Sequence, residues 1–104
     1  MVEYEWDVEE VTASASDDYE EGEVLDHNHQ GSYADCLTWI RDCPPPEGSR
    51  WEIVLVRDTT AKYWGTDRSW AYVENGKLPE FFTDGCGDED TKVPKRFIKE
   101  VERA

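Results

Sequence analysis

The sequence predicts an α+β domain in which an antiparallel sheet of four to five strands carries one main helix and a short C-terminal helix on one face, in the order β-β-α-β-β-β-α. Three observations predict it: apolar and acidic residues alternate over 2–12, an amphipathic segment lies between Ser32 and Pro44, and Asn75-Gly76 separates two apolar runs. The 104 residues fit one domain, 1–104, without room for a second core. Five Trp, five Tyr and three Phe favour a packed core over a disordered acidic chain.

The N-terminal segment has the clearest periodicity. Its apolar residues are Val2, Tyr4, Trp6 and Val8, and its acidic residues are Glu3, Glu5, Asp7 and Glu9. Alternation with period two predicts a strand with one face on the core and one face in water. Turn-forming residues at 13–22 predict a loop, and 23–30 is expected to return as a second strand.

The first helix is expected to begin at Ser32, with Asp35 completing a capping box. Five apolar residues recur at helical spacing and would form one apolar stripe along the helix: Tyr33, Cys36, Leu37, Ile40 and Cys43. Pro44-Pro45-Pro46 ends it, because proline lacks the N–H and disfavours helical geometry in the residue before it.

The second half supplies the remaining strands and the last helix. Residues 51–57 are apolar on both faces and predict a central strand, followed by a polar loop at 58–68 and a strand at 69–74. Asn75-Gly76 predicts a type I′ hairpin turn, and 77–83 is expected to return as an edge strand because it contains a proline. A short helix is expected over 94–103.

The net charge of −14 is concentrated at one end of the chain. Residues 1–40 contain twelve acids and no Lys or Arg, whereas residues 41–104 contain thirteen acids and all eleven bases. Same-face carboxylates on a strand lie about 6.7 Å apart, and a second acidic row would approach the phosphate density of a nucleic acid. The alternative is a solvated face that keeps the protein soluble, but self-repulsion without interspersed lysines destabilises a compact state.

Two groups of residues raise the question of metal binding. His27-x-His29 would place both imidazoles on one face of a strand, and the acids of Asp84–Asp90 alternate as in a calcium loop. The three cysteines lack zinc-ligand spacing, and the acidic loop lacks the twelfth-position glutamate of an EF-hand. We therefore expect no metal and no cofactor, although His27, His29 and this loop stay open as metal candidates.

Catalysis and membrane insertion are not expected. There is no Gly-x-Ser-x-Gly, no glycine-rich phosphate loop and no local Cys–His signature. No leader and no stretch long enough to span a bilayer is visible, and three cysteines without a secretion signal suggest reduced thiols in the cytoplasm. Bases on the terminal helix are opposed by the overall charge, so direct nucleic-acid binding is not expected.

In size, charge and lack of catalytic residues, the chain resembles the small acidic inhibitors of phages and mobile elements, the anti-CRISPR and DNA-mimicking anti-restriction proteins. No segment aligns with them, so no residue role is carried over. The resemblance implies a stoichiometric inhibitor, in the host cytoplasm if phage-encoded, that occupies a Lys/Arg-rich site on a nucleic-acid-binding protein.

The expected partner-binding residues are the acids of the N-terminal strand and of the segment after it: Glu3, Glu5, Asp7, Glu9, Asp17, Asp18, Glu20, Glu21 and Glu23. An alternative is a non-catalytic interaction module anchored by Tyr63 and Trp64, because aromatic residues dominate binding hot spots. A metal-binding protein is a third reading. The oligomeric state is not determined by the sequence.

Overall fold

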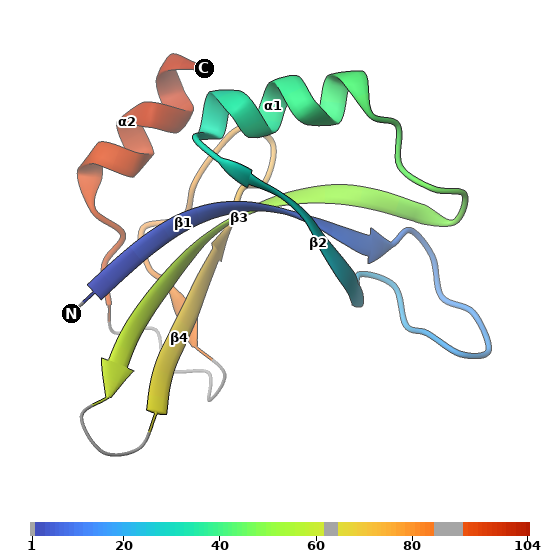
Figure 1. The fold of residues 1–104 in the computed structure, drawn as a ribbon, viewed down its shortest axis with the longest axis horizontal. Coiled ribbons are helices and arrows are strands. Elements are labelled where there is room, and N and C mark those ends of the chain that lie inside the picture. The colour runs from blue at the N-terminus through green and yellow to red at the C-terminus, as the bar shows by residue number, and fades with distance from the viewer. Residues whose placement is uncertain (1, 62–64, 85–90) are drawn as a thin grey trace.

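The computed structural model describes residues 2–61, 65–84 and 91–104, with side chains described for all of these except 60, 61, 65–67 and 84. The elements are β1 (Val2–Thr12), β2 (Val24–Gly31), α1 (Tyr33–Asp42), β3 (Ser49–Ala61), β4 (Gly65–Tyr72), β5 (Thr83–Asp84) and α2 (Lys95–Arg103). The strands form one antiparallel sheet in the order β2-β1-β3-β4-β5. The predicted α+β class and element order are confirmed (Figure 1).

The central pair of strands is β1 and β3. Their register runs from Val2 opposite Thr59 to Thr12 opposite Ser49, so both strands are paired over their full overlap. The polar loop expected at 58–68 is wrong: β3 continues to Ala61 and β4 begins at Gly65. Pairing with β1 on one side and β4 on the other holds these polar residues extended, which the local composition did not show.

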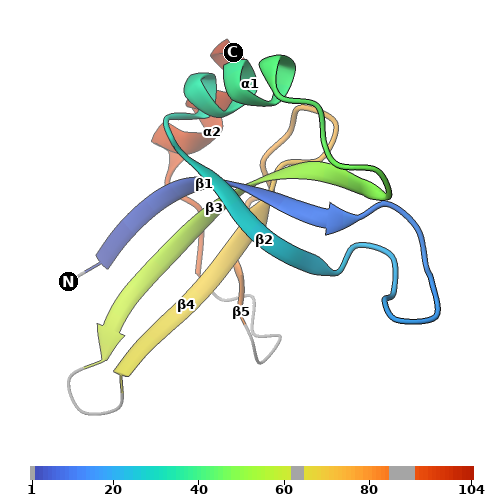
Figure 2. The ribbon, with the colours of Figure 1, turned by 45° about the vertical axis from the view of Figure 1, so that its right-hand side comes forward.

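Both helices pack on the same face of the sheet (Figures 1 and 2). Ser32 caps α1, its Oγ accepting a hydrogen bond of 3.1 Å from the Asp35 N–H. The carboxylate of Glu100 on α2 accepts a hydrogen bond of 2.8 Å from the Tyr33 N–H, which joins α2 to the start of α1. The core beneath them contains Trp6, Val8, Tyr33, Cys36, Ile53, Leu55, Ala71, Leu78, Phe82, Val93 and Val101.

The turn at Asn75-Gly76 is confirmed. Both residues have positive φ, 53° and 73°, and Glu74 and Lys77 exchange backbone hydrogen bonds of 3.0 Å. The edge strand expected over 77–83 is wrong, because only Thr83 and Asp84 pair with β4. A proline at position 79 cannot donate to a ladder, and the segment instead bonds to residues 91–93.

The strands arch, with both helices over the convex side (Figures 1 and 2). The face of the sheet opposite the helices, here called the concave face, carries the odd-numbered residues of β1 and their cross-strand partners on β3 and β4. No helix among the described residues is long and apolar enough to cross a membrane.

Candidate functional site

The acidic residues of β1 do not form one exposed row. Glu3 and Glu5 are exposed, as expected, but Asp7 and Glu9 are each only 2% exposed. The alternation itself is confirmed, since these residues lie on the face opposite Trp6 and Val8. The expectation that all four carboxylates point into water is therefore wrong for the inner two.

The burial of Asp7 and Glu9 comes from the neighbouring strands. On β2, Gln30 is opposite Asp7 and His27 is opposite Glu9; on β3, Val54 is opposite Asp7. The next strand places Tyr72 opposite Val54. Because the sheet bends toward this face, side chains from adjacent strands converge over its middle.

The environment of these two carboxylates opposes ionisation. Burial raises the pKa of Asp7, although the charges of His27 and Arg68 and a hydrogen bond from Gln30 act to lower it. Burial likewise raises the pKa of Glu9, against His27 and a hydrogen bond from Tyr72. One oxygen of each carboxylate, Oδ1 of Asp7 and Oε1 of Glu9, is buried without a hydrogen-bond partner.

The two histidines lie on opposite faces, contrary to expectation. Val8 pairs with His29 whereas Glu9 pairs with His27, so a β-bulge at Asn28 reverses the alternation. His29 stacks on Trp39 of α1 with ring centroids 5.3 Å apart. The Nδ1 atom of His27 lies 3.4 Å from Glu9 Oε2 and 3.8 Å from Asp7 Oδ2. The spacing of His27 and His29 in the sequence would place both on one face, but the bulged residue between them places them on opposite faces.

The connection between β1 and β2, residues 13–23, is here called the acidic loop. It projects from the sheet away from both helices (Figures 1 and 2). All five of its predicted site residues are exposed: Asp17, Asp18, Glu20, Glu21 and Glu23. The tip also exposes Tyr19, 46% accessible, which is not among the site residues predicted from the sequence. An exposed aromatic residue flanked by two acids on each side was the available signal.

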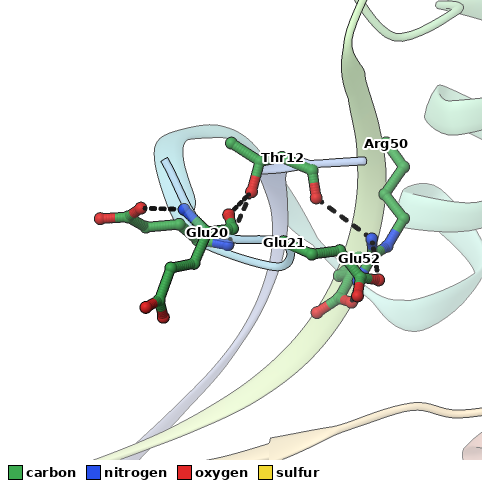
Figure 3. Close-up of polar contacts among 6 residues, drawn as sticks. Thr12, Glu20, Glu21, Arg50 and Glu52 are labelled. Atoms are coloured by element: carbon green, nitrogen blue, oxygen red, sulfur yellow. Dashed lines mark hydrogen bonds and ion pairs between the residues drawn. The ribbon is translucent and has the colours of Figure 1, made fainter. Parts of the chain in front are cut away.

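The base of the acidic loop is held by Thr12 (Figure 3). Its hydroxyl donates to the carbonyl of Glu20 and accepts a hydrogen bond of 2.9 Å from the Glu23 N–H. The Glu23 carboxylate folds back to accept from the Glu20 N–H at 3.1 Å. These contacts close the loop at its stem and order its backbone.

Arg50 of β3 neutralises one side of the stem (Figure 3). Its guanidinium donates to the Thr12 carbonyl and to Glu21 Oε1, both at 3.1 Å, and to Glu52 Oε1 at 3.0 Å. Within the described part of the chain, this is the one ion pair between the acidic loop and an Arg or Lys. Asp17, Asp18, Glu20 and Glu23 are left as the carboxylates of the loop without such a pair, and of these Glu23 accepts a backbone hydrogen bond within the loop.

The structure therefore divides the predicted site into three parts. Glu3 and Glu5 lie at one end of β1 and the acidic loop begins at the other, up to about 30 Å away at 3.4 Å per residue. The buried pair of Asp7 and Glu9 lies between them. Among the described parts of the predicted site, only the acidic loop presents more than two exposed carboxylates on one segment.

Tyr63, Trp64 and residues 85–90 of the acidic Asp84–Asp90 segment lie outside the described residues. Within the described residues, no group of three or more His, Cys, Asp or Glu side chains is arranged to hold a metal ion.

No protein-family model matches the chain, and the searches found no similar curated protein and no similar solved structure.

Proposed function

We propose that the chain is a stoichiometric inhibitor of the anti-CRISPR or anti-restriction type, which docks its acidic loop in a Lys/Arg-lined site of a nucleic-acid-binding protein and excludes the nucleic acid. It acts in the cytoplasm of the host cell. The observation that carries the proposal is the acidic loop itself: five exposed carboxylates within seven residues, of which one is paired with a base of the described chain.

The shape of the loop supports this function. Its stem is closed by hydrogen bonds through Thr12, so the carboxylates are presented on an ordered backbone. Preorganisation reduces the conformational entropy that binding must overcome. Tyr19 adds an aromatic contact of the kind that dominates protein interfaces.

The mechanism needs no bond making or breaking. The net charge of −14 attracts a basic groove over a distance and raises the association rate, while the loop carboxylates replace the phosphates there. Such contacts are screened by salt, so affinity falls as ionic strength rises. The contact made by the acidic loop does not include Asp7 and Glu9, which are buried in the unbound chain.

The test measures DNA binding by a panel of restriction–modification enzymes and CRISPR effector complexes, using the anisotropy of a labelled duplex. We expect the chain to release DNA from at least one of them at near-equimolar concentration, less effectively at high salt. The variant Asp17→Asn/Asp18→Asn/Glu20→Gln should lose this activity. It avoids Glu21 and Glu23, which hold the loop in place.

The matched control is Glu47→Gln/Glu80→Gln/Glu102→Gln, which removes the same charge from exposed positions outside the loop. It should inhibit like the unaltered chain. Equal loss in both variants would show that only total charge matters, and undisturbed DNA binding across the whole panel would contradict the proposal.

A further inference from the structure

The carboxylates of Asp7 and Glu9 are an unusual feature of the concave face. Each side chain is at least 97% buried, yet Asp7 Oδ1 and Glu9 Oε1 have no hydrogen-bond partner. An unsatisfied buried acceptor costs roughly 1–3 kcal/mol, and more if it is charged. Two such atoms two residues apart on one strand indicate a site that the isolated chain leaves incomplete.

The groups around the pair leave its charge in excess. On β1 the nearest same-face neighbour is Glu5, whose own pKa is raised by burial and by Asp7. The neighbouring strands place further groups around the pair: His27 and Gln30 on β2, Glu52 on β3, and Arg68 and Tyr72 on β4. On the helix side of the sheet, the charge of Asp7 contributes to the raised pKa of the Cys36 thiol. Among these described groups, one arginine and one histidine face four carboxylates.

His27 is the replaceable member of this cluster. Its side chain is 53% exposed, it lies on the edge strand β2, and the bulge at Asn28 precedes the next paired residue. The imidazole presents one ring nitrogen, Nδ1, to the two carboxylates. It does not supply the several donors that two carboxylates accept.

A cavity of about 350 Å³ opens on the same face around Glu5, the same-face neighbour of Asp7 along β1, and neither Asp7 nor Glu9 lines it. Its lining includes Glu3, Glu5 and Asp58, with Val56 as an apolar wall and Arg68 at 3.8 Å from Asp58. The volume equals that of about twelve waters at roughly 30 Å³ each, which is more than one long side chain requires. Carboxylates around an apolar wall suit a side chain with an aliphatic stem and a cationic head.

We propose that the concave face takes one arginine side chain of the basic partner, whose guanidinium displaces the His27 imidazole and donates hydrogen bonds to Asp7 and Glu9. This inference rests on the proposed function, because it names a group on the same partner. A guanidinium is always charged and carries five donors in a planar fork, so it can serve two carboxylates together. A lysine ammonium is a compact point charge and serves them less completely.

The test compares a nine-residue arginine peptide with a nine-residue lysine peptide, with affinities from calorimetry at fixed salt. The unaltered chain should bind the arginine peptide about tenfold more tightly, a difference of about 1.4 kcal/mol. Asp7→Asn/Glu9→Gln should bind both peptides equally. Asp17→Asn/Asp18→Asn/Glu20→Gln should weaken both peptides while keeping the preference for arginine.

Carboxyl ¹³C signals give a second measurement that needs no variant. Those of Asp7 and Glu9 should shift on addition of the arginine peptide and not of the lysine peptide. His27→Ala should keep or strengthen the arginine preference, because no imidazole has to leave. Unshifted carboxyl signals, or an arginine preference that survives Asp7→Asn/Glu9→Gln, overturn the inference. Failure of the loop variant to weaken binding would instead count against the proposed function.

Discussion

The Nδ1 atom of His27 lies 3.4 Å from Oε2 of Glu9, so a half-exposed imidazole on the edge strand faces a carboxylate that is 2% exposed. The bulge at Asn28 creates this relationship by turning His27 to the concave face while His29 stacks under α1. The acidic residues of the strand are therefore divided: Glu3 and Glu5 at its N-terminal end are exposed, and Asp7 and Glu9 in its middle form a covered cluster of charge.

Neutralising the covered carboxylates should stabilise the fold. Burial raises the pKa of both Asp7 and Glu9 above their unfolded values, so the folded state favours their protonated forms. The stability that protonation contributes is complete below about pH 4, the unfolded range, and is lost as the pH rises through the raised values. We expect Asp7→Asn to raise the free energy of unfolding by about 1 kcal/mol at pH 7.

Urea unfolding at pH 7 and at pH 4 checks this prediction. The advantage of Asp7→Asn should shrink at pH 4, where the unaltered chain carries protonated carboxyls. Glu3→Gln on the exposed end of the strand is the control and should change little. A less stable Asp7→Asn at pH 7 would show that its partners compensate for burial.

The stem of the acidic loop should depend on the Thr12 hydroxyl. Thr12→Val keeps the side-chain shape but removes a donor to the Glu20 carbonyl and an acceptor for the Glu23 N–H. We expect a loss of about 1 kcal/mol in unfolding free energy and faster hydrogen exchange at the Glu23 amide. Thr38→Val, at an exposed helix position, is the control. Unchanged exchange would mean that the backbone bonds alone close the stem.

The turn after β4 should be sensitive to backbone conformation alone. Gly76 has φ of 73°, and a Cβ added there would meet no atom within 4 Å. Gly76→Ala should therefore destabilise the fold by about 1 kcal/mol through conformation, without a clash. Gly76→Asn should lose less, because asparagine tolerates the left-handed region. Equal losses in thermal or urea unfolding would contradict this explanation.

The thiol of Cys36 should be unreactive in the folded chain. Burial, with the nearby charges of Asp7, Asp35 and Glu100, raises its pKa to about 11. The thiolate is the reactive form, so alkylation at pH 8 should modify Cys43, which is partly exposed, well before Cys36. Peptide mass spectrometry after timed iodoacetamide treatment measures both, and urea should make the two rates similar. Rapid native labelling of Cys36 would show that the core opens locally.

Local patterns predicted most of the elements because their causes are local. Period-two alternation identified β1, Ser32 and the proline run bounded α1, and Asn75-Gly76 identified its turn, each through the preferences of a few adjacent residues. The extension of β3 through Asp58 was missed because its cause is pairing with β1, more than fifty residues away. The strand expected at 77–83 failed for a related reason, since alternation cannot show that a ladder partner is missing.

The sequence by itself determined that the charge is gathered in the first forty residues, that the N-terminal strand has an apolar and an acidic face, and that the class is α+β. Only the tertiary structure decided which acids water reaches. Solvent access depends on the bend of the sheet and on side chains from three neighbouring strands, and one bulged residue decides the face that His27 joins. Burial is a property of the assembled sheet, so two of four chemically similar carboxylates became a covered cluster and two remained surface charges.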